Sequence, residues 1–439
     1  MKRLLLVLSV LILLGGTAWL FLRGDGSPLN PPLSLSDGSV LVFRGVTYGT
    51  NHQFAAAGWR GVLGRMLPRK LTGRLGRGPS VTTAAPSLTV WVERRGGGGG
   101  PVNPQYVLGT GTNFAPAHSN HFTSAGGGPG ASIIEGYGFA SFPRRGRMIT
   151  LRLYDRGGGG SNWERPTLAG EITFRNPAPS AAAPWTPEPL PATKRVDDFD
   201  VTLKDVFVNA DWNRRRPLKP VTNAVNASVF ARLHFSRDGK RLDEWSAPKV
   251  ELSDATGNRL SSSSWSGGLQ EKDYELQFTG TLWPDEKAWK MRFELSRLTN
   301  FTTAELWTVR GLPLGSTNLT NNAAFATNLQ GVVVQIEAVS PKSQSQATHE
   351  LFIRVRPDRP DYRLTLVSVK DESGRKPSQH GSSWGGGEYK YSLDVHTNAQ
   401  TLDVTLALHQ SRYVEFLAQP KLLDEATAKA DEAARKQRK

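Results

Sequence analysis

The chain has 439 residues, too many for one ordinary sandwich domain, and this length predicts two to four domains. An excess of 54 Lys and Arg over 39 Asp and Glu gives a net charge of +15, which favours phospholipid head groups, acidic polymers or nucleic acid as partners without choosing among them. With no cysteine, disulfides, thiolate nucleophiles and Cys-ligated metal sites are excluded. The 45 glycines and 28 prolines indicate many turns, and we predict an all-β fold.

An apolar run over residues 4–22 follows Lys2 and Arg3. In a helix it would rise ~28 Å, close to the ~30 Å hydrocarbon core of a bilayer. We predict an uncleaved transmembrane anchor with a cytoplasmic stub, while the bulk lies outside the cytoplasm, in the periplasm or at the cell surface. The alternatives are a signal peptide cleaved after the small residues 16–18, which would give a secreted protein, and a buried core helix. Residues 24–37, with three prolines, are predicted to be an extended spacer.

Residues 38–177 read as a divergent β-sandwich with alternating strands at 41–48 and 88–94. Between these strands, segment 58–77 has apolar residues at helical spacing and predicts a short basic helical insertion. Its charges are Arg60, Arg65, Arg69, Lys70, Arg74 and Arg77. We expect it to bind an anionic lipid or acidic polymer surface. The alternatives are a helix that only covers the end of the sandwich, and nucleic-acid binding, which the predicted external location disfavours.

Two further domains are predicted at 196–313 and 331–420, the second repeating the first. Asp254 matches Asp371 in an acidic turn, and Tyr274 is matched to Tyr391. A Pro-rich linker at 178–195 and a Ser/Thr/Asn linker at 314–330 separate the domains. Asp238-Gly239 predicts a type I′ hairpin. Segment 421–439 has acids and bases at i,i+4 spacing and predicts a charged helical tail.

The sequence contains no established catalytic or metal motif. His118 and His121 lack the H-E-x-x-H pattern, and no G-x-S-x-G elbow occurs. We therefore expect no enzyme activity, no cofactor and no metal, although two acids on distant strands would escape this search. Trp265 and Trp384 lie beside Gly-Gly in both repeats. They are candidate platforms for carbohydrate or peptidoglycan, the alternative being that each packs back over its sandwich edge.

These observations favour tandem antiparallel β-sandwiches, which resemble immunoglobulin- or fibronectin-type modules by strand count and alternation only. The expected function is a membrane-anchored extracytoplasmic binding or envelope-structural protein without catalysis, with an envelope protein as its partner. The alternative is a carbohydrate- or peptidoglycan-binding protein that uses the repeated tryptophans. This alternative includes a carbohydrate-active protein.

Overall fold

The structure is a computed structural model. It describes residues 30–35, 37–54, 79–96, 105–110, 113–116, 119–125, 132–155, 167–208, 228–270, 273–320, 322–341 and 348–422. The predicted anchor 4–22, the basic insertion 58–77 and nearly all of the tail 421–439 lie outside these residues. Within the described part of the chain, no helix is long and apolar enough to cross a membrane.

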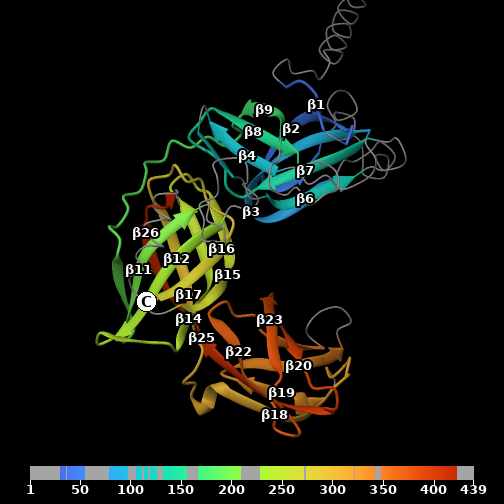
Figure 1. Ribbon diagram of the computed structural model, residues 1–439, viewed down its shortest axis with the longest axis vertical. Helices are drawn as coiled ribbons and strands as arrows, with labels where there is room; N and C mark the ends of the chain where they lie inside the picture. The colour runs from blue at the N-terminus through green and yellow to red at the C-terminus, as the bar shows by residue number, and fades with distance from the viewer. Residues whose placement is uncertain are drawn as a thin grey trace, which may run out of the picture.

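The predicted all-β class is confirmed for the described residues, whose strands pair antiparallel except for the short parallel pair of β11 and β27 (Figure 1). The helical turns in these ranges are two short 3₁₀ segments, η1 (Thr303–Glu305) and η2 (Ala323–Phe325). The strands fall into three groups, each enclosing its own hydrophobic core.

The first domain packs a five-stranded sheet against a four-stranded sheet. The five-stranded sheet has the order β1 (Leu33–Ser34), β2 (Val40–Gln53), β3 (Ser80–Arg95), β7 (Ile133–Phe139) and β6 (Ser119–Ala125). The other has the order β5 (Asn113–Pro116), β4 (Gln105–Thr110), β8 (Met148–Asp155) and β9 (Thr167–Arg175). Buried apolar residues such as Val90, Phe139 and Leu151 fill the space between the sheets.

The second domain is one long ladder that turns back on itself. Its order is β10 (Ala192–Val196), β11 (Phe199–Val208), β12 (Ser228–Arg237), β16 (Asp273–Thr279), β15 (Arg259–Gln270), β14 (Trp245–Asp254), β17 (Trp289–Arg297) and β26 (Arg412–Ala418). The short strands β13 (Lys240–Arg241) and β27 (Lys421–Leu422) pair with β12 and β11. The ladder folds at β15, because its first half pairs with β14 and its second half with β16.

The third domain again has two sheets. Five strands follow the order β19 (Ala326–Leu329), β20 (Val332–Pro341), β21 (His349–Arg356), β24 (Glu388–Asp394) and β23 (Ser378–Gly385). Three strands follow the order β18 (Leu306–Pro313), β25 (Thr401–Gln410) and β22 (Tyr362–Asp371). The five-strand order β19-β20-β21-β24-β23 repeats β10-β11-β12-β16-β15 of the second domain and β1-β2-β3-β7-β6 of the first.

The outer strand of the second sheet comes from a different part of the chain in each domain. In the first domain β9 follows β8 and pairs with it. In the second domain β17 pairs with β26, whose residues come after the third domain. In the third domain β25 pairs with β18, whose residues directly follow the second domain. The second and third domains have therefore exchanged this strand with each other.

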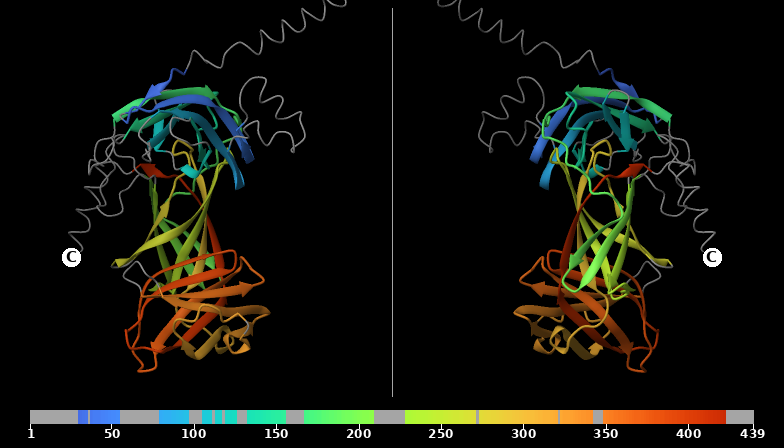
Figure 2. Two further views of the ribbon diagram at one scale, coloured as in Figure 1. Left: turned by 90° about the vertical axis from the view of Figure 1, so that its right-hand side faces the viewer. Right: turned by 90° about the vertical axis from the view of Figure 1, so that its left-hand side faces the viewer.

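The exchange produces a two-stranded ribbon that runs through both domains (Figure 2). β17 leads into β18, and β25 leads into β26 with only Ser411 between them. Because β17 pairs with β26 and β18 with β25, two polypeptide stretches stay antiparallel neighbours across the boundary. The two domains meet through corresponding ends, where the hairpin loops 197–198 and 330–331 lie together.

This pairing moves the domain boundaries that we predicted from sequence. Segment 306–313 belongs to the sheet of the third domain, and segment 412–418 to that of the second. The predicted linker 314–330 contains η2 and β19, and its Leu319 and Leu329 are buried in the third core. Alternation along a sequence identifies strands but not the sheet that each one joins, and this is why the boundaries differ.

The Pro-rich segment before the second domain is extended, as predicted, but it is not a free spacer. The Glu188 amide donates to the Leu417 carbonyl on β26 (2.7 Å), and the Lys290 ammonium lies 5.5 Å from the centre of the Trp185 ring. The Ser180 amide donates to the Arg144 carbonyl of the first domain (2.8 Å). These contacts attach the segment to both of the domains that it joins.

Two predicted turns form at the expected residues. Arg237 and Lys240 pair across Asp238-Gly239, and both turn residues have positive φ, as a type I′ hairpin requires. The Asp254 carboxylate accepts from the Thr256 amide and hydroxyl, and the Asp371 carboxylate accepts from the same groups of Ser373. The repeated acids therefore hold the same turn.

Candidate functional site: the polar junctions between domains

The structure describes few of the sequence-predicted site residues. Trp384 lies half-buried near the end of the edge strand β23, and the guanidinium carbon of Arg363 sits 3.8 Å from the centre of its ring. One ring face is therefore covered by protein and closed to a sugar. Trp265 lies on β15, where the backbone pairing but not the side chain is described. The six basic residues between 60 and 77 lie outside the described ranges.

The β-ladder gives the two tryptophans different neighbours. Trp265 is opposite Gln277, whereas Trp384 is opposite Tyr389. The burial patterns of β16 and β24 align Tyr274 with Tyr389, two residues before the predicted match Tyr391. The two tryptophans therefore do not occupy equivalent positions in the repeat.

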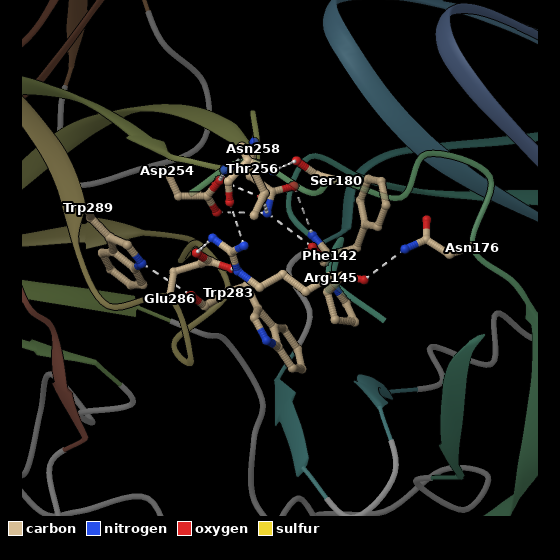
Figure 3. Close-up of polar contacts among 12 residues, drawn as sticks. Phe142, Arg145, Asn176, Ser180, Asp254, Thr256, Asn258, Trp283, Glu286 and Trp289 are labelled. Atoms are coloured by element: carbon tan, nitrogen blue, oxygen red, sulfur yellow. Dashed lines mark hydrogen bonds and ion pairs between the residues drawn. The ribbon is translucent and has the colours of Figure 1, made fainter. Parts of the chain in front are cut away.

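The first and second domains meet at a polar junction that Figure 3 shows in close-up. The Arg145 guanidinium donates two parallel hydrogen bonds to the Glu286 carboxylate, each 2.8 Å long. This bonding to Glu286 raises the pKa of Arg145. Glu286 is buried, while 37% of the Arg145 side chain is exposed. A bidentate pair of this kind fixes direction as well as distance.

The turn acid Asp254 organises the rest of this junction. Its carboxylate accepts from the Asn258 amide (3.1 Å) and side-chain Nδ2 (2.8 Å). The same Nδ2 donates to the Phe142 carbonyl of the first domain (3.0 Å; Figure 3). Trp283 of the second domain packs into the core of the first, and its carbonyl accepts from the Trp289 indole (3.1 Å). Asp254 is therefore a turn residue that positions a docking contact.

The second and third domains share a buried ion pair at their junction. The Arg363 guanidinium donates to Glu294 Oε1 at 3.1 Å, and the Ser411 hydroxyl donates to the same oxygen at 2.9 Å. Arg363 is 7% exposed and Glu294 6%. Arg363 belongs to the third domain, Glu294 to the second, and Ser411 to the ribbon between them.

His409 lies beside this pair and is fully buried. Its Nε2 is within hydrogen-bonding distance of the Thr365 hydroxyl (3.1 Å) and the Ser296 hydroxyl (3.4 Å). Its Nδ1 has no partner among the described residues. Burial, reinforced by the positive charge of Arg297, lowers the pKa of His409 from 6.5 to about 4. The imidazole is therefore neutral at pH 7.

A pocket of about 450 Å³ opens at the same junction. Four carboxylates, three guanidinium groups, three side-chain amides and one indole line it. They belong to Asp197, Asp198, Arg237, Glu244, Trp245, Arg297, Asn300, Glu305, Gln330, Gln410 and Arg412. Ion pairs connect Arg412 to Asp197, Arg237 to Asp198 and Arg297 to Glu305. The pocket is strongly polar, but its charges largely compensate one another.

Sequence reasoning identified Asp254 as a turn acid but did not identify the ion pair of either junction. Glu286 follows Asp285 in a turn and Glu294 lies in a strand, and their partners lie 141 and 69 residues away. One signal was available, because Arg363 and Arg412 each lie next to a tyrosine at the start of a strand. That signal does not name a partner.

The described residues contain no group of three or more His, Asp or Glu side chains placed to hold a metal ion. The chemistry that both junctions support is hydrogen bonding and charge pairing.

Comparison with known proteins gives little. No protein-family model matches the chain, and no curated protein matches its sequence. One solved structure that matches is "The crystal structure of the conserved domain protein from Bacillus anthracis", which is 18% identical over 51% of this chain and 78% of that chain. Its TM-score of 0.17 is too low to support an argument about fold.

Proposed function

We propose that this chain is a membrane-anchored, extracytoplasmic binding or envelope-structural protein without catalysis, built from immunoglobulin-like sandwiches. Residues 4–22 are the anchor in this proposal, and an envelope protein is the partner. The function requires the described domains to keep a fixed arrangement, so that a partner is held at a set distance from the bilayer.

The observation that supports this role is that each domain boundary is closed by specific contacts. The bidentate pair of Arg145 and Glu286 closes the first boundary, and the docked segment 176–191 spans it. The exchanged strands and the pair of Arg363 and Glu294 close the second. Domains joined in this way keep fixed positions relative to one another, whereas domains on flexible linkers would not.

The location is tested by fractionating cells that express the full chain and by adding protease to intact spheroplasts. The expected result is membrane-bound protein whose domains are digested from outside. Replacing residues 4–22 with a cleavable signal peptide should release the domains into the soluble extracytoplasmic fraction. Full-length protein in the cytosol, or protection from external protease, would refute the proposal.

A further inference from the structure

We propose that the pocket between the second and third domains binds a neutral saccharide. This inference deepens the binding part of the proposed function and rests on it only for the biological setting. The site is separate from Trp384, whose ring is covered on one face by Arg363. Its volume of about 450 Å³ lies within the ~300–1,000 Å³ typical of small-molecule sites.

The position of the pocket suits a preformed binding site. The two domains meet through corresponding ends, so equivalent hairpin loops contribute to it from both sides: Asp197 and Asp198 from the second domain and Gln330 from the third. The ribbon adds Gln410 and Arg412. Because the exchanged strands hold both walls, the pocket geometry is fixed before any ligand arrives.

The charges select against an ionic ligand. Asp197, Asp198 and Glu305 are each paired with an arginine, while the fourth carboxylate, Glu244, accepts from Asn300 Nδ2 (3.1 Å) and lies 3.8 Å from Arg237. Burial raises the pKa of Glu305, but hydrogen bonds from Thr302 and the charge of Arg297 outweigh it, so that this pKa is lowered and the carboxylate stays ionised. A charged ligand would have to break one of these pairs. A neutral molecule can instead use the remaining hydrogen-bonding capacity.

That capacity matches hydroxyl groups, each of which both donates and accepts. Gln410 uses its Oε1 to accept from Arg412 (3.0 Å), and Gln330 uses its Nε2 to donate to the Leu408 carbonyl (3.4 Å). Each amide therefore retains its second polar atom, one a donor and the other an acceptor. Neighbouring hydroxyls of a sugar ring need such a mixture, whereas a phosphate or carboxylate needs donors alone.

Two buried donors in the pocket wall lack partners among the described residues, the indole Nε1 of Trp245 and the Nε of Arg237. Trp245 is 8% exposed, and its ring stacks on Phe199 with centroids 4.6 Å apart, so the core fixes its position. Leaving a buried donor unpaired costs about 1–3 kcal/mol. Both N–H groups are shielded from solvent as the side chains stand. An acceptor oxygen of the ligand would remove this cost.

The test uses the full chain in a zwitterionic detergent, because alkyl glucosides and maltosides would compete for the pocket. Isothermal titration with maltose and with the N-acetylglucosamine disaccharide should give a Kd of about 0.1–1 mM for at least one of them. The galacturonic acid disaccharide should bind at least tenfold more weakly. Binding of the acidic sugar alone, or of none of the three, would overturn the proposal.

The site is assigned by variants. Gln330→Leu combined with Gln410→Leu should weaken binding at least tenfold, whereas Gln379→Leu on the exposed strand β23 should leave it unchanged. Trp245→Phe keeps an aromatic ring, although a smaller one, and removes an N–H that has no partner among the described residues, so binding should weaken about three- to tenfold with little change in far-UV circular dichroism. If Trp384→Ala abolishes binding and the glutamine variants do not, the pocket is the wrong site.

These outcomes are distinguishable from failure of the proposed function. Sugar binding is measured on purified protein and does not depend on where the chain lies in the cell. The fractionation experiment does not depend on the pocket.

Discussion

The middle domain is joined to its two neighbours by different means. Its contact with the first domain is made by side chains and a docked linker, among which Arg145 and Glu286 form the central pair. Its contact with the third domain is made by main chain, because each domain lends the other a strand. The first junction can open while both domains stay folded. The second cannot open without removing an edge strand from both sheets.

The two equivalent turns also make different contacts. The turn at Asp254 docks the first domain through Asn258. The equivalent turn at Asp371 carries Arg375 in that place, whose guanidinium contacts only His396 (3.0 Å) among the described hydrogen bonds. No counterpart of Trp283 or Glu286 occurs in the short connection 395–400. The turn at Asp371 therefore lacks the Asn, Trp and Glu side chains with which the second domain contacts the first.

The largest expected effect comes from removing the exchanged strand. Truncation after Gln410 deletes β26, which contributes Val414, Phe416 and Ala418 to the core of the second domain. We expect a chain that does not fold cooperatively, while truncation after Leu422 leaves the described domains unchanged. Thermal unfolding followed by circular dichroism compares the two. Phe416→Ala alone should cost about 3–5 kcal/mol, and a native-like midpoint in the shorter truncation would disprove the exchange.

The next largest effect on stability is expected from breaking the buried ion pair of Arg363 and Glu294. Arg363→Met leaves the Glu294 carboxylate buried with Ser411 as its remaining partner at this junction, and such a change typically costs about 3–5 kcal/mol. Arg310→Met, at an exposed position, serves as the control and should change the unfolding free energy by less than about 0.5 kcal/mol. Urea denaturation measures both. Equal effects of the two substitutions would mean that the pair does not support the junction.

His409 should make the second junction sensitive to acid. Its pKa is about 4 when folded and 6.5 as a free side chain, so the unfolded chain binds the proton more tightly. The stability that the neutral His409 contributes is fully present above pH 6.5. It is lost as the pH falls toward 4, which lowers the unfolding free energy by up to roughly 3 kcal/mol. His409→Gln should reduce the pH dependence of the unfolding free energy in this window by that amount. Parallel pH profiles for variant and parent would contradict the assignment.

The smallest effect is expected at the first junction. Arg145→Met with Glu286→Gln should lower stability by no more than about 1–3 kcal/mol, because Arg145 is partly exposed. The geometry should change more than the stability. Since the chain has no cysteine, spin labels can be attached at Thr82→Cys, Thr279→Cys and Ser378→Cys, one in each domain.

Double electron–electron resonance then compares the Arg145→Met, Glu286→Gln variant with its parent. In the variant, the distance distribution between labels 82 and 279 should be broader, and that between labels 279 and 378 should be unchanged. Broadening of both, or of neither, would remove the distinction between the two junctions.

The sequence predicted the strands and turns but not their partners. Alternation indicated the strands around 41–48 and 88–94, and the Asp-Gly pair at 238–239 indicated its hairpin, because these signals are local. The exchange of β18 and β26 was unpredictable, since either strand could complete either sheet with the same pattern. Tyr274 was matched two residues too far along because strand residues alternate with period two, so a shift of two preserves the pattern.

The candidate site was less predictable still. The tryptophans stood out by residue type, yet the pocket is lined mainly by ordinary Asp, Gln and Arg residues drawn from positions 197 to 412. Such a set has no sequence spacing to recognise. Only the meeting of two equivalent domain ends brings it together.

The place of β26 in the chain sets the order in which the protein can be completed. A ribosome synthesises residues 412–418 after the whole third domain, yet the second domain needs them to close its sheet. Until those residues emerge, the second domain exposes the edge of β17, and β18 lacks its neighbour β25. A nascent chain that stalls early thus presents unpaired strand edges, the surface on which aggregation starts and which chaperones and proteases detect. The sheet of the second domain is therefore completed only after the third domain has been synthesised.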